Sequence, residues 1–89
     1  MKIKEGFVLR PVGGDNVVVP LGPAAENFHG MVRLNDTGAF LWKRLQELGE
    51  ASEDELADAL VAEYGIDKAR ATDDVHDFAQ TLLSASVFE

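Results

Sequence analysis

The residue types that could carry out catalysis are few in this sequence, and their spacing does not suit it. The two histidines, His29 and His76, have no second ligand at the spacing of an H-x-x-x-H or H-x-x-E-H metal motif. The chain has no cysteine, so thiolate nucleophiles, disulfides and sulfur ligands for zinc are excluded. The serines lack the G-x-S-x-G context of a nucleophile elbow. We therefore expect no catalytic residues, no metal and no cofactor, and a protein that is not an enzyme.

Two further motifs match ligand sites in composition only. The stretch "PVGGD" (11–15) has two glycines but lacks the Lys-Ser/Thr pair and the following helix of a phosphate loop. The acidic run "SEDELAD" (52–58) offers several carboxylates at the start of a predicted helix. Acidic groups there interact favourably with the helix dipole and lie on its solvated face. We interpret the first motif as a hairpin turn and the second as a helix start.

Charge is distributed unevenly along the chain. Residues 1–35 carry four basic and three acidic groups, whereas residues 36–89 carry four basic and thirteen acidic groups, and the net charge is −8. A nucleic-acid partner requires a basic footprint that neutralises phosphates. The second half of the chain therefore argues against binding nucleic acid.

Length and composition indicate one small folded domain that spans residues 1–89. Of the 89 residues, 46% are hydrophobic and 27% are charged, which is typical of a globular rather than a disordered chain. The opening "MKIKEGFVLRPVGGD" has no apolar run like that of a signal peptide, and no later stretch is long enough to cross a bilayer. We expect a soluble cytoplasmic protein with no membrane partner.

The first third of the chain is predicted to form three strands, because large apolar and β-branched residues dominate it. The strands are residues 6–12, 16–21 and 28–35, with a turn at 13–16 and a loop at 22–27. Pro20 cannot donate to a strand ladder, so it belongs near a strand end. In the third strand, Val32 and Leu34 lie on one face, and Met31 and Arg33 lie on the other.

The rest of the chain is predicted to form three helices with clear start and stop signals. Asn35 or Asp36 can cap the first helix, Ser52 and Glu55 form a capping box for the second, and Asp67 caps the third, which runs to about Ser84. Gly49 and Gly65 are helix stops. Apolar stripes at helical spacing predict the buried faces: Gly38, Leu41, Trp42, Leu45 and Leu48; Leu56, Ala57, Leu60, Val61 and Tyr64; Val75, Phe78, Ala79, Leu82 and Leu83.

Gly38 is unusual because it lies in the first turn of a helix, where glycine costs roughly 0.5–1 kcal/mol relative to alanine. Its place on the apolar stripe, just after the third strand, indicates a close approach of backbones. At the other end of the chain, Val87 and Phe88 predict a tail that folds back onto the domain.

Together these elements predict an α+β domain, in which a three-stranded antiparallel sheet is followed by three helices in a winged helix-turn-helix-like arrangement. A winged-helix DNA-binding transcriptional regulator is the alternative function. Its third helix would read the major groove. That helix carries Lys68 and Arg70 against Asp73, Asp74 and Asp77, which disfavours contact with phosphates.

An open sheet edge offers a different kind of binding site. Three strands are too few to close a barrel, so the edges of the sheet carry unpaired N–H and C=O groups. An extended peptide can satisfy these groups by adding a strand, and a helix beside the edge can supply pockets for alternate side chains. We expect a polypeptide to be the partner.

The sequence also resembles a known family over nearly its whole length. "LNDTGAFLW" (34–42) is similar to the L-N-x-T-G-x-x-x-W signature of PqqD-like proteins, which take their name from protein D of pyrroloquinoline quinone biosynthesis. "DVHDFAQTLLSASVF" (74–88) resembles their D-V-x-x-F-x-x-x-L pattern. "VLRPVGGDNVVVPL" (8–21) and "SEDELADALVAEYGID" (52–67) also fit the family. The sequence departs at 85–88, where the family often has Gly-Leu-Leu or Gly-Leu-Val.

The resemblance implies a function in natural product biosynthesis. PqqD-like domains are recognition elements for ribosomally synthesised, post-translationally modified peptides, which makes them peptide chaperones. They bind the leader segment of a precursor peptide and present it to a modifying enzyme, such as a radical SAM protein, or to a leader protease. An accessory subunit that docks only to an enzyme remains a third interpretation. An unprotected edge also makes a homodimer a possible state.

The resemblance further implies where the leader binds, namely the edge of the third strand beside the third helix. Residues His29 to Leu34 would pair with it, and either Met31 and Arg33 or Val32 and Leu34 would face its side chains. On the helix, Ala71, Asp74, Val75 and Phe78 would form the wall, although Val75 and Phe78 also fit a plain core role. Arg33 would pair with a leader acid or with an aspartate of the third helix. Asn35 and Gly38 are interpreted as structural.

Overall fold

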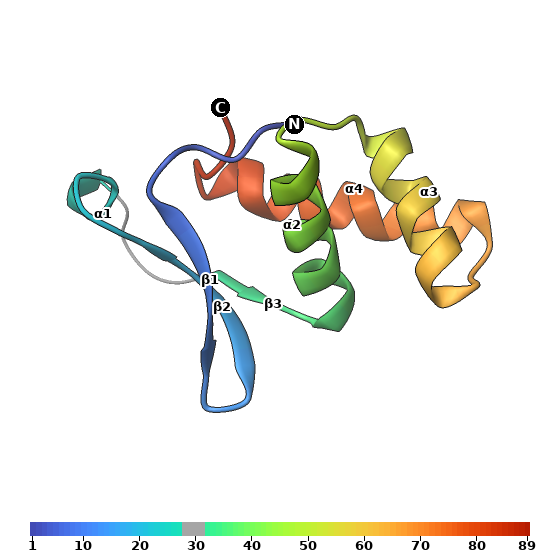
Figure 1. Ribbon diagram of the computed structural model, residues 1–89, viewed down its shortest axis with the longest axis horizontal. Coiled ribbons are helices and arrows are strands. Elements are labelled where there is room, and N and C mark those ends of the chain that lie inside the picture. Colours follow the sequence, from blue (N-terminus) through green and yellow to red (C-terminus); the bar gives the residue numbers. More distant parts are fainter. Residues whose placement is uncertain (28–31) are drawn as a thin grey trace.

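The computed structural model describes residues 1–27 and 32–89 (Figure 1). Its elements are β1 (Phe7–Val12), β2 (Asp15–Pro20), α1 (Ala24–Asn27), β3 (Val32–Leu34), α2 (Asp36–Leu48), α3 (Glu53–Tyr64) and α4 (Lys68–Ser84). The predicted α+β architecture, with an antiparallel sheet followed by three helices, is confirmed.

One element differs from the prediction. Residues 24–27, predicted as part of a loop, form the short helix α1. The amide of Ala25 donates to the carbonyl of Gly22 at 3.0 Å, and that of Ala24 donates to Leu21 at 3.3 Å, so the loop tightens into a single turn. A helix of one turn is too short to show a helical repeat of apolar residues, so the sequence pattern gave no signal for it.

The sheet has the strand order β1-β2-β3, and both neighbouring pairs are antiparallel. β1 and β2 are joined by Gly13 and Gly14, whose φ angles of 58° and 89° are those that a two-residue hairpin turn demands. Pro20 is the last residue of β2, as predicted. Residues 28–31 of the predicted third strand lie outside the described residues.

The helix boundaries follow the predicted capping residues. The side chains of Asn35, Ser52 and Asp67 accept hydrogen bonds from the amides of Gly38, Glu55 and Arg70, and Ser52 with Glu55 forms the complete capping box. Gly49 and Gly65 follow α2 and α3 with positive φ. α2 begins directly after β3, and α4 runs back behind α2 toward the sheet (Figure 1).

The core lies between the inward face of the sheet and the three long helices, with Trp42, Leu45, Leu60 and Leu82 fully buried. The prediction of burial was wrong for three residues of the apolar stripes. Leu48, Tyr64 and Leu83 are 43%, 45% and 57% exposed. Leu48 and Tyr64 lie in the last turns of their helices. The Tyr64 ring instead contacts Phe40 edge-on at a centroid distance of 5.7 Å.

The tail folds back as predicted and closes one end of the core. Phe88 forms an antiparallel bridge with Ile3, and the amide of Lys4 donates to the carbonyl of Val87 at 2.9 Å. Val87 is fully buried. Both termini therefore lie close together on the same side of the molecule (Figure 1). Among the residues described, no helix is both long enough and apolar enough to traverse a bilayer.

Candidate functional site

The third strand forms one edge of the sheet. β3 pairs with β2 through Val32, Arg33 and Leu34, and no described segment pairs with its other side (Figure 1). Its outer backbone groups are therefore available to a visiting strand.

The register shows which backbone groups point outward. A two-residue turn makes Val12 and Asp15 a hydrogen-bonded pair, and such pairs alternate along an antiparallel ladder. Odd-numbered residues of β2 therefore bond to β1, and even-numbered ones bond to β3. Val18 faces Val32 and Asn16 faces Leu34, so both of these β3 residues bond to β2. Arg33 is left with its N–H and C=O directed at the open edge.

The opposite edge of the sheet, formed by β1, is less receptive. Pro11 is paired with Asn16, which is a non-hydrogen-bonded position of the same ladder. The ring nitrogen of Pro11 therefore points away from β2, at a place where any other residue would present an N–H. A proline at an outer edge blocks strand addition. Within the described residues, the β3 edge has no such proline, and the helix α2 begins directly after it.

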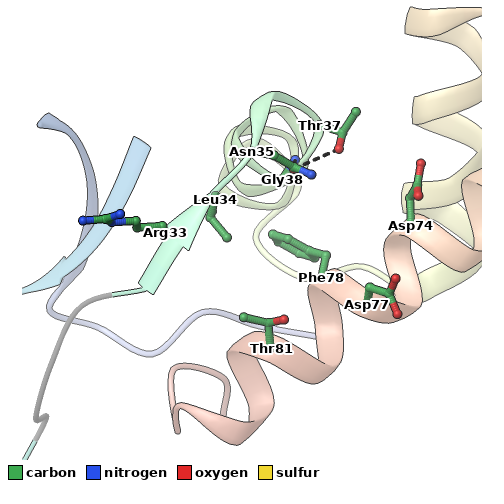
Figure 2. A pocket seen from close by; sticks show the side chains of 9 residues that line it. All are labelled: Arg33, Leu34, Asn35, Thr37, Gly38, Asp74, Asp77, Phe78 and Thr81. Carbon is green, nitrogen blue, oxygen red and sulfur yellow. Dashed lines mark hydrogen bonds between the residues drawn. The ribbon is translucent and has the colours of Figure 1, made fainter. Parts of the chain in front are cut away.

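An open pocket lies beside β3, between the start of α2 and one face of α4 (Figure 2). Its volume is about 310 Å³. The side chains of Leu34 and Phe78 point toward one another from the two walls and form an apolar floor, while Asp74 and Asp77 project from α4 (Figure 2). The lining residues are Arg33, Leu34, Asn35, Thr37, Gly38, Asp74, Asp77, Phe78 and Thr81.

Four of the residues predicted to contact a peptide meet at this pocket: Arg33, Leu34, Asp74 and Phe78. Val32 is half-buried and packs against the core from the same strand face as Leu34. Ala71 and Val75 face the core and are fully buried, so they support the α4 wall from behind without lining the pocket. His29 and Met31 lie outside the described residues.

The two faces of β3 have different environments. Leu34 faces the pocket floor, and the side chain of Arg33 points away from it toward the sheet (Figure 2). The guanidinium of Arg33 lies 4.0 Å from the carboxylate of Asp15 on β2, so its partner is not an aspartate of α4. The face of β3 that bears Leu34 is therefore the one directed at α4.

Some lining residues were not assigned to the site from sequence. Asp77 and Thr81 follow Asp74 by three and seven residues, so helical spacing alone would have placed them on the same face of α4. Asn35, Thr37 and Gly38 belong to the cap of α2. Asn35 Oδ1 accepts a hydrogen bond from the amide of Gly38 at 2.8 Å and one from the hydroxyl of Thr37 at 3.0 Å. The signature motif therefore forms one wall of the pocket as well as the helix cap.

Gly38 lies in a close contact, as its sequence position indicates. A Cβ at this residue would lie 3.1 Å from Asn35 Oδ1 and 3.2 Å from the Cβ of Leu34. Both distances are shorter than ordinary van der Waals contacts. The glycine thus allows α2 to start against the last residue of β3.

Metal-binding clusters of three or more histidine, cysteine or acidic residues are not found in the described ranges 1–27 and 32–89. His76 is exposed, and its Nδ1 lies 3.4 Å from Glu53 Oε1 on the neighbouring helix. The described pocket therefore offers an open strand edge, an apolar floor and carboxylates.

Comparisons with known proteins identify relatives of this fold. The family model for coenzyme PQQ synthesis protein D (PqqD) matches residues 6–87. A structure of TbiB1 in complex with the TbiA(beta) leader peptide has a TM-score of 0.74 and 26% sequence identity, and the alignment covers 100% of this chain and 95% of that chain.

A structure of lasso peptide synthetase B1 complexed with the leader peptide is similar in fold. Its TM-score is 0.67 at 19% identity, over 93% of this chain and 89% of that chain. No curated protein matches the sequence. The family model covers nearly the entire chain. The chain therefore belongs to the PqqD family.

Proposed function

We propose that this domain binds the leader segment of a ribosomally synthesised precursor peptide and presents it to a modifying enzyme or a leader protease. The leader adds as a strand to β3, with alternate side chains directed into the pocket beside α4. Membership of the PqqD family supports this function. So does the similarity to two proteins whose structures hold a leader peptide.

The observation that carries the proposal is the outward backbone of Arg33 next to an open pocket with an apolar floor. Micromolar affinity requires about −8 kcal/mol. Strand hydrogen bonds contribute roughly 1 kcal/mol each and do not offset the cost of ordering a peptide. Two or three buried apolar leader side chains, at about 1.5–3 kcal/mol each, supply the difference. We therefore expect apolar anchors in the leader at alternate positions.

We propose a smaller set of leader contacts than the sequence alone suggested, based on which side chains line the pocket. The backbone of Val32–Leu34 forms the pairing edge, and Leu34, Asp74 and Phe78 contact leader side chains. Ala71 and Val75 act indirectly by holding α4 in place. His29 and Met31 extend the predicted strand and stay predicted contacts.

The same proposal includes an enzyme partner and a cellular place. PqqD-like domains present the bound peptide to a second protein, so a radical SAM protein or a protease is the expected partner. Ribosomal precursor peptides are made in the cytoplasm, and we place the domain there.

A proline substitution in β3 tests strand addition directly. Arg33→Pro removes the N–H that faces the open edge and leaves the bonds of Val32 and Leu34 to β2 in place. Arg33→Ala removes the same side chain but keeps the N–H, which makes it the matched control. The probe is a synthetic leader from the small open reading frame nearest to the gene, titrated by calorimetry and by amide NMR.

We expect Arg33→Ala to bind within a few-fold of the unmodified protein and Arg33→Pro to bind at least tenfold more weakly. The loss corresponds to one neutral strand hydrogen bond together with the disturbed register of its neighbours. If both variants bind like the unmodified protein, or if the NMR shifts avoid β3 and α4, strand addition at this edge is refuted.

We also infer that, without a leader, the β3 edge can pair with the β3 edge of a second copy to form a symmetric homodimer. The dimer should then dissociate when the leader is added, because both use the same outward groups. Sedimentation velocity over a range of concentrations measures this. A dimer that persists in Arg33→Pro would place the contact elsewhere.

A further inference from the structure

The wall of the pocket that α4 contributes has two different chemical characters. Phe78 lies opposite Leu34 and is apolar, whereas Asp74 and Asp77 place carboxylates one turn earlier and at the adjacent position (Figure 2). Asp74 is half-buried, and Asp77 is exposed at the rim. A peptide that lies along β3 must therefore meet an apolar surface and a negatively charged surface in succession.

The two carboxylates have no cation of the described chain to neutralise them. Neither Asp74 nor Asp77 forms an ion pair or a side-chain hydrogen bond among the described residues. The cation at the start of the same helix, Lys68, is bound to Asp54 and Asp58 of α3. Arg33, the one basic side chain among the described residues that line the pocket, lies against Asp15.

The spacing along α4 matches the spacing along a strand. Asp74 and Phe78 are four residues apart, which is about 6 Å along a helix axis. Side chains on the same face of a strand repeat every two residues, or about 6.6–6.8 Å. When a leader strand runs alongside α4 and one of its side chains covers Phe78 and Leu34, its side chain two positions away therefore comes close to Asp74.

We propose that the groove selects leaders in which an apolar residue and a lysine or arginine are separated by one residue, with the apolar side chain over the Leu34–Phe78 floor and the cation at Asp74 and Asp77. This inference rests on the proposed leader binding and adds the chemical class of the ligand. A leader with an acid at the second position is disfavoured, because it adds a like charge beside two carboxylates. Long-range attraction from the acidic second half of the chain acts in the same direction.

Selection from a phage-displayed library of random linear peptides, at low salt, tests the preference and does not require the natural leader. Three proteins are compared: the unmodified chain, the double variant Asp74→Asn/Asp77→Asn, and Asp73→Asn. Asp73 is an exposed acidic residue next to Asp74 on the same helix, and it does not line the pocket. Its variant therefore removes one negative charge close to the pocket but outside it. Circular dichroism verifies that each variant is folded, and calorimetry measures the affinity of one selected peptide with Lys, Gln or Glu at the second position.

We expect the unmodified chain and Asp73→Asn to enrich the apolar-x-basic pattern and to bind the Lys peptide about fivefold to tenfold more tightly than the Glu peptide. The double variant should lose the pattern and bind the Lys and Glu peptides within about twofold of each other. If the enriched peptides shift the amides of β3 but show no basic preference, the charge inference is wrong and leader binding stands. If no enriched peptide shifts β3 or α4, strand addition itself fails and the charge inference fails with it.

Discussion

Gly38 connects the cap of α2 to the floor of the proposed groove. Its amide donates to Asn35 Oδ1, and a Cβ at this position would make tight contacts with Asn35 and Leu34. Leu34 in turn faces Phe78 across the pocket (Figure 2). The glycine of the signature motif therefore packs directly against a residue that forms the pocket floor.

Replacing Gly38 with alanine tests this connection. Alanine is favoured over glycine in a helix by about 1 kcal/mol, but overpacking at a tight contact costs about 1–3 kcal/mol. Because the added Cβ would lie 3.1–3.2 Å from its neighbours, we expect a net destabilisation of about 1 kcal/mol in urea unfolding, together with weaker leader binding. The control is Ala69→Gly at an exposed position of α4, which should be destabilised without any change in peptide affinity. A stabilised Gly38→Ala variant would contradict the close-contact explanation.

At the scale of single residues, the sequence predicts on which face of a strand or helix a side chain lies better than it predicts which residue that side chain contacts. Alternation correctly placed Leu34 opposite to Arg33, because side chains of a strand point to opposite faces. It could not show that Asp15 is the partner of Arg33, since this depends on the register of β2 against β3. Helical spacing likewise put Val75 and Phe78 on one stripe, but only packing shows that Phe78 reaches the pocket and Val75 does not.

At the scale of elements, α3 and α4 are joined at one end by a shared cation. Lys68 at the start of α4 binds Asp58 and Asp54 of α3, and the hydrogen bonds to these two carboxylates raise the pKa of the Lys68 ammonium above its usual value. The folded state then holds this proton more tightly than the unfolded state does. Its contribution to stability is therefore fully present below the unfolded pKa of 10.5 and is lost as pH rises through the folded pKa.

The difference in unfolding midpoint between the unmodified protein and Lys68→Met measures this contribution. We expect the stability advantage of the unmodified protein over Lys68→Met to be constant below the unfolded pKa of 10.5 and to decrease as pH rises above it. The decrease should be small, because both partners are exposed to solvent. Lys43→Met, at an exposed position with no ion pair among the described residues, is the control and should show no such pH dependence.

The helices were the most predictable elements because their ends are encoded locally. Asn35, Ser52 and Asp67 each satisfy an amide three residues later, so the start of each helix depends on a hydrogen bond within one turn. The exposed Tyr64 and Leu83 were not predictable in the same way. Periodicity predicts the direction in which a side chain points from its helix. Whether a neighbouring element extends far enough to cover that side chain depends on the tertiary structure.

At the scale of the whole molecule, the winged-helix-like fold is combined with a charge distribution that suits a peptide better than DNA. The helix that would read a major groove is α4, and it carries Asp73, Asp74 and Asp77. We expect no sequence-specific retention of genomic DNA fragments in a gel shift at physiological salt. Sequence-specific retention of a DNA fragment, by the unmodified protein and equally by Asp74→Asn, would contradict this prediction and indicate that the domain binds DNA.

The closure of the domain by its own two ends leads to the last prediction. Phe88 is 6% exposed, lies 6.1 Å from Phe78 between ring centroids, and pairs with Ile3, so it joins the N-terminus, the tail and the pocket wall. Truncating a buried phenylalanine to alanine typically costs about 3–5 kcal/mol. The total stability of such a domain is only about 5–15 kcal/mol.

We therefore expect Phe88→Ala to lower the urea midpoint strongly and to weaken leader binding, because Phe78 loses its support. Leu83→Ala is the control, since Leu83 is 57% exposed and its loss should cost about 0.5 kcal/mol or less. If Phe88→Ala unfolds like Leu83→Ala, the tail is not part of the cooperative core, and the support that it gives to the α4 wall must come from elsewhere.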